Sequence, residues 1–265
     1  MGNRPEVIKG SCHDCQGNKN NRDEKNLSHP LLEGMKKKYM NIIIAICVLI
    51  FASSLYVSVE GFEDTKPWCI LLTTCVRRAG STPEKTKEIL EVYKRSIDKW
   101  LETDLPIIVV DSSEYEFKEY EGTRLKVCNF MCKETESSSV SEALSVLYAI
   151  HNCNHTQKYK NIVKITGRYY IDDFSSILKN LGDDSDLYIQ QINNPVIQWQ
   201  HSEIFGFNKK YADDIFQPII KERLMMEKQL WNISHINNYT VRNFPKMPNV
   251  FKVTRGGDGL LVDPL

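Results

Sequence analysis

The chain has 265 residues, and its 34 basic and 34 acidic side chains give a formal net charge of zero. This balance disfavours nucleic-acid binding, which usually shows as a basic excess. A hydrophobic fraction of 42% with 26% charged residues is ordinary for a folded protein and excludes a wholly disordered chain.

An uncharged apolar run extends from Ile42 to Val59. A helix of this length spans roughly 27 Å, which is close to the hydrocarbon thickness of a bilayer. Three lysines precede the run and acidic residues follow it, so the positive-inside rule places the N-terminal side in the cytoplasm. We therefore predict a type II membrane protein with a disordered cytoplasmic tail (1–38), a transmembrane signal-anchor helix (39–59) and a lumenal domain (60–265).

Short apolar segments after the span have the lengths of buried β-strands. They cover residues 68–76, 105–111, 125–128, 162–165, 187–191 and 196–207. Helical segments separate most of them, and this alternation indicates an α/β domain with a mostly parallel sheet. In such a sheet the loops after the strand ends meet at one rim, where ligands bind.

Two of the predicted helices have start signals. Thr82 followed by Pro83 predicts an N-cap and a first helical turn, and apolar residues recur at helical spacing over the next 20 residues. Ser139 and Glu142 have the spacing of a capping box and predict the start of a second helix. One long helix is expected over residues 218–233.

The cysteines divide between the tail, the span and the lumenal part. Cys12 and Cys15 form a CxxC in the tail, which offers too few further ligands for a zinc site. The lumenal side, where disulfides persist, contains Cys69, Cys75, Cys128, Cys132 and Cys153. Because five is odd, at least one thiol is left over or bonds another chain, and the spacing leaves the pairing open.

Three N-glycosylation sequons begin at Asn154, Asn232 and Asn238. They are consistent with a lumenal domain, although an Asn-rich chain of this size contains a similar number by chance.

Two groups at the first strand ends are candidates for nucleotide binding. The turn from Arg77 to Thr82 follows the first strand and precedes a helix, so its guanidinium and backbone N–H groups suit a phosphate. Asp111 ends the second strand, where a carboxylate accepts hydrogen bonds from a ribose or base. The alternatives are a solvated turn and a turn-initiating aspartate.

The end of the fourth strand is basic. Lys164 and Thr166 share one face, Gly167 permits a close backbone approach, and Arg168 follows, so this rim could neutralise a diphosphate without a metal. The adjacent acids at 172–173 could instead hold a divalent ion, but Asp172 is more simply the cap of a short helix that ends at 181.

Glu203 is the candidate general base. Strand alternation places it on one face with aromatic side chains, and partial desolvation there would raise its pKa towards the range of a general base. The alternative is that the segment is not a regular strand. Glu227 falls on an apolar helical stripe and shows a weaker form of the same pattern.

The order of these segments resembles the nucleotide-sugar glycosyltransferases of the GT-A type. The resemblance rests on LLTTCV, IIVVDSS, SSSVSEALSVLYAI, IVKITGRYYI and SEIFGF, and it extends from Lys66 to Trp231. The single span with a short tail is similar to Golgi glycosyltransferases. The resemblance implies one GT-A-like (Rossmann-like) domain that transfers a sugar from a nucleotide-sugar donor to a glycan or glycoprotein acceptor in the Golgi or endoplasmic reticulum.

The resemblance also implies roles for individual residues. Glu203 would deprotonate the acceptor hydroxyl, and the donor would contact Thr73, Thr74, Arg77, Asp111, Lys164 and Arg168. Most such enzymes hold a metal with an Asp-x-Asp at the end of the fourth strand, where this chain has Thr166-Gly167-Arg168. The sequence therefore identifies no metal ligands, and it leaves dependence on Mn²⁺ or Mg²⁺ open.

Two other functions fit parts of the sequence. The stretch Arg78-x-Gly80-Ser81-Thr82 resembles the 5′-phosphosulfate loop of Golgi carbohydrate sulfotransferases, but the second signature of that family is missing. A non-catalytic, lectin-like ectodomain with a transferase-like fold would bind glycans without a nucleotide.

Overall fold

The computed structural model describes residues 39–48, 66–134, 136–190, 198–236, 238–245, 253–254 and 261–262. The chain divides into two units, Met1–Gly61 and Phe62–Leu265. In the first unit residues 39–48 form a helix with exposed side chains, whereas the rest of the predicted tail and span lies outside the described residues. Across the described ranges, no helix combines the length and the apolar character that crossing a bilayer requires.

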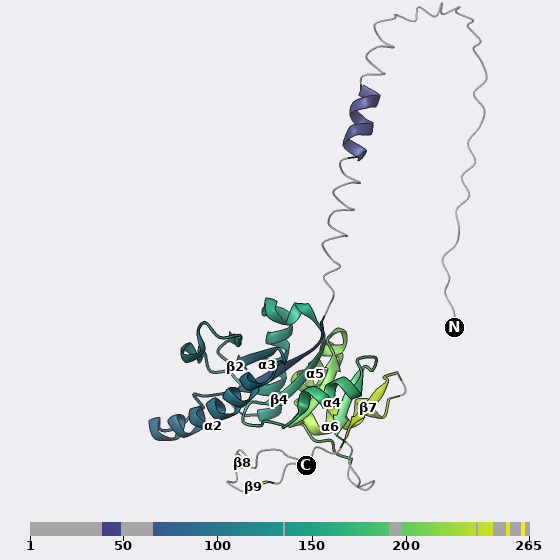
Figure 1. Cartoon of the computed structure of the whole chain (residues 1–265). Coiled ribbons are helices and arrows are strands. Elements are labelled where there is room, and N and C mark those ends of the chain that lie inside the picture. Colours follow the sequence, from purple (N-terminus) through teal and green to yellow (C-terminus); the bar gives the residue numbers. More distant parts are fainter. Residues whose placement is uncertain are drawn as a thin grey trace, which may run out of the picture. The chain divides into compact units, whose positions relative to one another are not determined.

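A seven-stranded sheet organises the second unit (Figure 1). Its strand order is β3-β2-β1-β4-β6-β5-β7. Its strands are β1 (Lys66–Thr74), β2 (Ile107–Asp111), β3 (Lys126–Asn129), β4 (Tyr159–Thr166), β5 (Leu187–Gln190), β6 (Ile204–Asn208) and β7 (Val241–Phe244). Only β6 runs against its neighbours, so the predicted α/β domain with a mostly parallel sheet is confirmed. A separate short pair joins β8 (Val253–Thr254) to β9 (Leu261–Val262).

Helices cover both faces of this sheet (Figure 1). They are α2 (Pro83–Glu102), α3 (Ser138–Asn152), α4 (Phe174–Leu181), α5 (Ala212–Glu222) and α6 (Met226–Ser234), with short 3-10 turns η1 (Lys118–Tyr120), η2 (Asn154–Lys158) and η3 (Lys209–Tyr211). Alternation along β1 explains the layering. Leu71 packs with α3, α5 and α6, and its neighbour Leu72 packs on the opposite face with α2 and α4.

The helix starts agree with the sequence at one predicted cap and differ at another. Thr82 caps α2, with its hydroxyl accepting the Lys85 N–H at 3.2 Å, as predicted. The predicted capping box at Ser139 is wrong, because Ser137 caps α3 through the Val140 N–H at 3.3 Å. Glu142 is consequently not used as a cap.

Other differences arise where left-handed backbone or tertiary contacts end an element. The expected strand over 196–207 is regular only in β6, whereas residues 198–203 form no strand and 196–197 lie outside the described residues. The expected single helix over 218–233 is two helices, because Arg223 adopts a left-handed φ of 52° and ends α5. Asp173, not Asp172, precedes α4, also with a positive φ.

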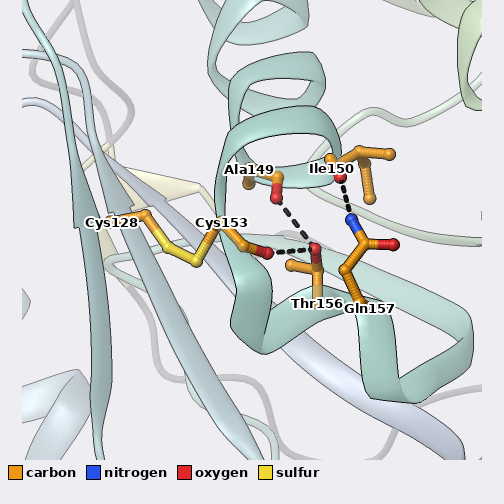
Figure 2. Close-up of a disulfide and its surroundings, with 6 residues drawn as sticks. All are labelled: Cys128, Ala149, Ile150, Cys153, Thr156 and Gln157. Carbon is orange, nitrogen blue, oxygen red and sulfur yellow. Dashed lines mark hydrogen bonds between the residues drawn. A yellow bond between two sulfur atoms is a disulfide. The ribbon is translucent and has the colours of Figure 1, made fainter. Parts of the chain in front are cut away.

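A disulfide links β3 to the end of α3 (Figure 2). It joins Cys128 to Cys153, so it resolves the pairing that the sequence leaves open. Cys69 is a buried free thiol in the core, and Cys75 and Cys132 are partly buried free thiols in the loops after β1 and β3. Burial raises the pKa of the Cys69 and Cys75 thiols, which keeps both in the neutral form at pH 7.

Candidate functional site

The carboxyl ends of β1, β2 and β3 surround a hollow of about 600 Å³, which we call the rim hollow. It is lined by Arg77, Glu114, Tyr115, Glu116, Phe117, Lys118, Glu119 and Asn129. The volume lies within the range of small-molecule sites, about 300–1,000 Å³. Its position is the one where open α/β sheets bind ligands.

Arg77 and Tyr115 form the part of the rim hollow that suits a nucleotide. The Arg77 guanidinium lies 5.5 Å from the centre of the Tyr115 ring and 3.4 Å from the Glu114 carbonyl oxygen. A flat aromatic ring beside a cation offers a stacking surface and a charge for an anionic group.

Two of the acids in the wall are paired. Glu116 lies 2.8 Å from Lys118, and Glu119 lies 3.0 Å from Lys94 outside the hollow. The Lys118 ammonium lowers the pKa of Glu116, so this carboxylate stays ionised and paired at pH 7. These pairs offset much of the negative charge that the wall would otherwise present to an anion.

Asp111 holds the loops of the rim hollow in place. It has no exposed surface, and its carboxylate accepts hydrogen bonds from the Thr74 hydroxyl (2.8 Å), the Val76 N–H (3.2 Å), the Ser113 N–H (2.8 Å), the Ser113 hydroxyl (2.6 Å) and the Tyr115 N–H (3.0 Å). Because these donors use both carboxylate oxygens, Asp111 positions the loops and does not line the hollow. Thr74, which the resemblance also places at the donor, is buried as well and donates its hydroxyl to Asp111.

Two residues of the β2 loop have left-handed backbone. Glu114 has a φ of 55° and Phe117 a φ of 49°, each of which costs about 1 kcal/mol or more for a residue other than glycine. The hydrogen bonds to Asp111 and the burial of Phe117 offset this cost. The loop is therefore fixed in a conformation that its own sequence does not favour.

Lys164 is buried at the end of β4, where one carboxylate neutralises its charge and neutral oxygens accept its other protons. Its ammonium lies 2.5 Å from the Glu142 carboxylate, 2.7 Å from the Ser202 carbonyl and 3.0 Å from the Thr166 hydroxyl. The Thr73 hydroxyl donates to the same Glu142 oxygen at 3.1 Å. We call these five residues the Lys164 cluster. With all three ammonium protons engaged and no exposed surface, Lys164 does not reach a ligand directly in this structure.

Arg168 lies at the same rim and has a donor without a partner. Its side chain is partly buried, its guanidinium lies 5.3 Å from the centre of the Tyr169 ring, and its Nε is buried without a hydrogen-bond partner. Gly167 beside it fits the predicted close approach, since an added Cβ would lie 2.5 Å from the Thr74 methyl group and 2.9 Å from the Thr73 carbonyl oxygen.

Glu203 has the opposite pKa shift from the one that the sequence predicts. Burial raises its pKa, but the hydrogen bond and charge of His201 and the charge of Lys164 outweigh this effect and lower the pKa to about 2. The His201 Nδ1 lies 3.5 Å from the carboxylate. The expected rise fails because the strand pattern takes account of burial but not of the favourable interactions with His201 and Lys164.

The acids considered as metal ligands are not gathered in the structure. Asp172 and Asp173 are exposed at the start of α4, and Asp173 accepts the Ser176 hydroxyl at 2.8 Å. Among the described residues, no group of three or more His, Cys, Asp or Glu side chains is placed to hold a metal ion. The end of β4 itself has Thr166, Gly167 and Arg168 in place of carboxylates.

Sequence reasoning missed Glu142, Asn129, Tyr115 and Ser202. Asn129 could have been found, because it is a polar residue at the end of a strand that was itself predicted. Glu142 was assigned to a cap. Ser202 lies within the predicted 196–207 strand but was given no role there, and in the structure its hydroxyl donates to Glu227 at 2.8 Å. Only the fold places Glu142 beside Lys164.

No family model matches this sequence, and no curated protein matches it. Solved structures do resemble it. A protein described as a nucleotide-diphospho-sugar transferase from Desulfovibrio desulfuricans is 13% identical, with 68% of this chain and 80% of that chain covered and a TM-score of 0.45. The glycosyltransferase GlyE of Streptococcus pneumoniae is 8% identical, with 68% and 45% covered and a TM-score of 0.43. A glycosyltransferase involved in the glycosylation of the major capsid of PBCV-1 is 8% identical, with 66% and 82% covered and a TM-score of 0.41. Similarities of this size establish neither an activity nor a ligand.

The buried ion pair can be tested by a double-mutant cycle. We expect Lys164→Met to lower the free energy of unfolding by about 3 kcal/mol, because it leaves the Glu142 carboxylate without its cation. Adding Glu142→Gln should recover about 1 kcal/mol or more, because the unpaired charge is removed. Urea denaturation measures both values, and strictly additive losses would contradict the interaction.

A matched control is the exposed pair of Lys85 and Glu88 on α2, which are 3.1 Å apart. Lys85→Met and Glu88→Gln should each change the free energy of unfolding by less than about 0.5 kcal/mol.

The shifted pKa of Glu203 makes stability depend on pH. Its folded-state pKa of about 2 lies below the ordinary 4.5, so the ionised carboxylate stabilises the fold above pH 4.5. This contribution, on the order of 3 kcal/mol, is lost as the pH falls from 4.5 towards 2. Urea denaturation at about pH 5 and about pH 3 should show a smaller loss in Glu203→Gln than in the wild type. Equal losses in the two proteins would contradict the assignment.

Proposed function

We propose that the chain is a membrane-anchored glycosyltransferase that transfers a sugar from a nucleotide-sugar donor to a hydroxyl of a glycan or glycoprotein. The observation that carries the proposal is the rim hollow, with Arg77 and Tyr115 at the carboxyl ends of parallel strands. In an open α/β sheet this is the place where nucleotides bind.

The donor would lie across the rim from the hollow towards β4. Its base would stack near Tyr115 and hydrogen-bond to the Asn129 amide, and Arg77 would meet a phosphate. Since Asp111 already fixes these loops, little conformational entropy is lost when the ligand binds. The buried residues of the rim would hold the binding groups in position without touching the donor. They are Thr73, Thr74, Asp111 and Lys164.

The leaving diphosphate would bind at Arg168. The unpaired Nε of this residue is a buried donor that an anionic oxygen would satisfy. A preorganised cation there would stabilise the negative charge that develops as the glycosyl–phosphate bond breaks. This role needs no metal ligand from the chain.

The acceptor would be activated at His201 and Glu203. A carboxylate with a pKa of about 2 is a poor base, so the imidazole of His201 would take the hydroxyl proton while Glu203 orients it and stabilises its charged form. The acceptor oxygen then bonds to the anomeric carbon as the nucleoside diphosphate departs. Both side chains are partly exposed, as an acceptor site requires.

The compartment is supported by three features. The Cys128–Cys153 disulfide suits an oxidising lumen, and the asparagines of all three sequons are exposed. The uncharged run from Ile42 to Val59 suits a signal anchor, with the second unit in the lumen of the Golgi or endoplasmic reticulum.

Donor binding is tested by thermal unfolding of the full chain in detergent micelles. We expect nucleoside diphosphates and at least one nucleotide sugar to raise the melting temperature by roughly 5–10 °C at saturating ligand. Arg77→Ala and Arg168→Ala should reduce this shift, whereas Lys85→Ala, on the exposed side of α2, should leave it unchanged. The screen is run with and without Mn²⁺.

Other outcomes of the same screen would contradict the proposal. Preferential binding of a sulfonucleotide would favour a carbohydrate sulfotransferase. Glycan binding that needs no nucleotide and survives Arg168→Ala would favour a lectin-like ectodomain.

Sugar transfer is tested with the donor identified by the screen. His201→Ala and Glu203→Gln should each lower kcat by about 10²-fold or more while the donor still raises the melting temperature. Radiolabelled transfer to a panel of glycans measures the rate. Wild-type rates in both variants would show that this pair does not activate the acceptor.

A further inference from the structure

The sequon that begins at Asn154 directly follows Cys153, and its third residue, Thr156, lies close to the disulfide in Figure 2. Cys153 ends α3 and is bonded to Cys128, and Asn154 is the first residue of η2. Asn154 is exposed, so the folded domain has room for a glycan on it. Thr156, the third residue of the same sequon, has no exposed surface.

Folding uses the Thr156 hydroxyl for another purpose. Its Oγ1 lies 2.9 Å from the Ala149 carbonyl and 2.8 Å from the Cys153 carbonyl, and the Gln157 amide donates to the Ile150 carbonyl at 2.7 Å (Figure 2). These contacts satisfy carbonyls that the end of α3 leaves open. The group that marks Asn154 as an acceptor is therefore buried once this corner has formed.

The other two sequons are not tied to a disulfide. The Ser234 hydroxyl donates to the Trp231 carbonyl within α6, and the Thr240 hydroxyl donates to Asp186 at the exposed start of β7. Asn232 and Asn238 therefore serve as internal references for glycosylation.

We propose that Asn154 is N-glycosylated only before the Cys128–Cys153 bond closes, so that glycan transfer and disulfide closure compete for the same corner of the chain. The inference rests on the lumenal placement in the proposed function. A glycan that is added before the disulfide forms stays on Asn154, because this residue is still exposed after the disulfide has formed. A disulfide that closes first leaves the site unmodified.

The two competing reactions are balanced as follows. In glycan transfer, the Asn154 amide nitrogen bonds to the anomeric carbon of a lipid-linked oligosaccharide diphosphate, the carbon–phosphate oxygen bond breaks, and the amide proton leaves. In closure, one S–S bond forms, and two protons and two electrons pass to a disulfide-exchange oxidant of the lumen. The two reactions share no reactant, so they compete only through the conformation of this corner.

Their timing makes the competition direct. Cys153 immediately precedes Asn154, so the second thiol and the acceptor asparagine enter the lumen together. At least about 110 residues follow Asn154 along the chain, and their synthesis alone takes roughly 6–22 s at 5–20 residues per second. Disulfide formation on a scale of seconds falls within this interval.

The test is the occupancy of each sequon in the full chain expressed in the secretory pathway of a eukaryotic cell, measured by mass spectrometry of its peptides. Cys128→Ala leaves the Asn154 sequon intact and should raise its occupancy at least about twofold over the wild type, because closure is prevented. Occupancy of Asn232 and Asn238 should not change. Cys132→Ala is the matched control, because it removes a free thiol four residues further along.

A second experiment uses the wild-type chain, in case Cys128→Ala fails to fold. Brief treatment of wild-type cells with a membrane-permeant thiol during synthesis, followed by its removal, should raise Asn154 occupancy in protein that then regains its disulfide. Equal occupancy in all arms, or an equal rise at all three sequons, would overturn the proposal. If Asn232 and Asn238 are glycosylated and Asn154 never is, the proposal fails and lumenal placement stands. If no sequon is ever glycosylated, both fail.

Discussion

The buried charge of Lys164 constrains the centre of this domain, because an ammonium without exposed surface must be neutralised and hydrogen-bonded. Glu142, in the first turns of α3, neutralises this charge with its carboxylate 2.5 Å from the ammonium. The carbonyl of Ser202, just before β6, accepts a hydrogen bond from the same ammonium at 2.7 Å. Three parts of the chain far apart in sequence are thereby held at the end of β4. Ser202 lies between His201 and Glu203, so the position of the proposed acceptor site depends on the ion pair of Lys164 and Glu142.

Asp111 plays the corresponding role at the neighbouring strands. One buried carboxylate accepts five hydrogen bonds and fixes the loops after β1 and β2, including backbone that only tertiary contacts make favourable. The rim hollow is consequently a preformed feature. Of the six residues that the resemblance implies as donor contacts, Asp111 and Lys164 are fully buried and act as internal supports, whereas Arg77 is exposed and Arg168 is partly buried.

The disulfide between Cys128 and Cys153, with the turn that follows it, is the part of the fold that depends on an oxidising compartment. Cys128–Cys153 fastens the end of α3 to β3, and the residues after it complete the helix end through Thr156 and Gln157. Because this corner also contains a sequon, its folding and its modification draw on the same few residues. The proposed lumenal setting therefore makes the order of the two reactions part of the maturation of the domain.

Local patterns determined much of the architecture from the sequence alone. Period-2 and helical periodicities located most of the strands and helices, and Thr82 capped its helix as expected, because these signals depend on neighbours within a few residues. Tertiary structure decided the rest. The division of the 218–233 helix, the burial of Lys164 and the lowered pKa of Glu203 each depend on a backbone turn or a charge brought close by folding. Electrostatic environment is set by distance in space, and the linear sequence does not contain that distance.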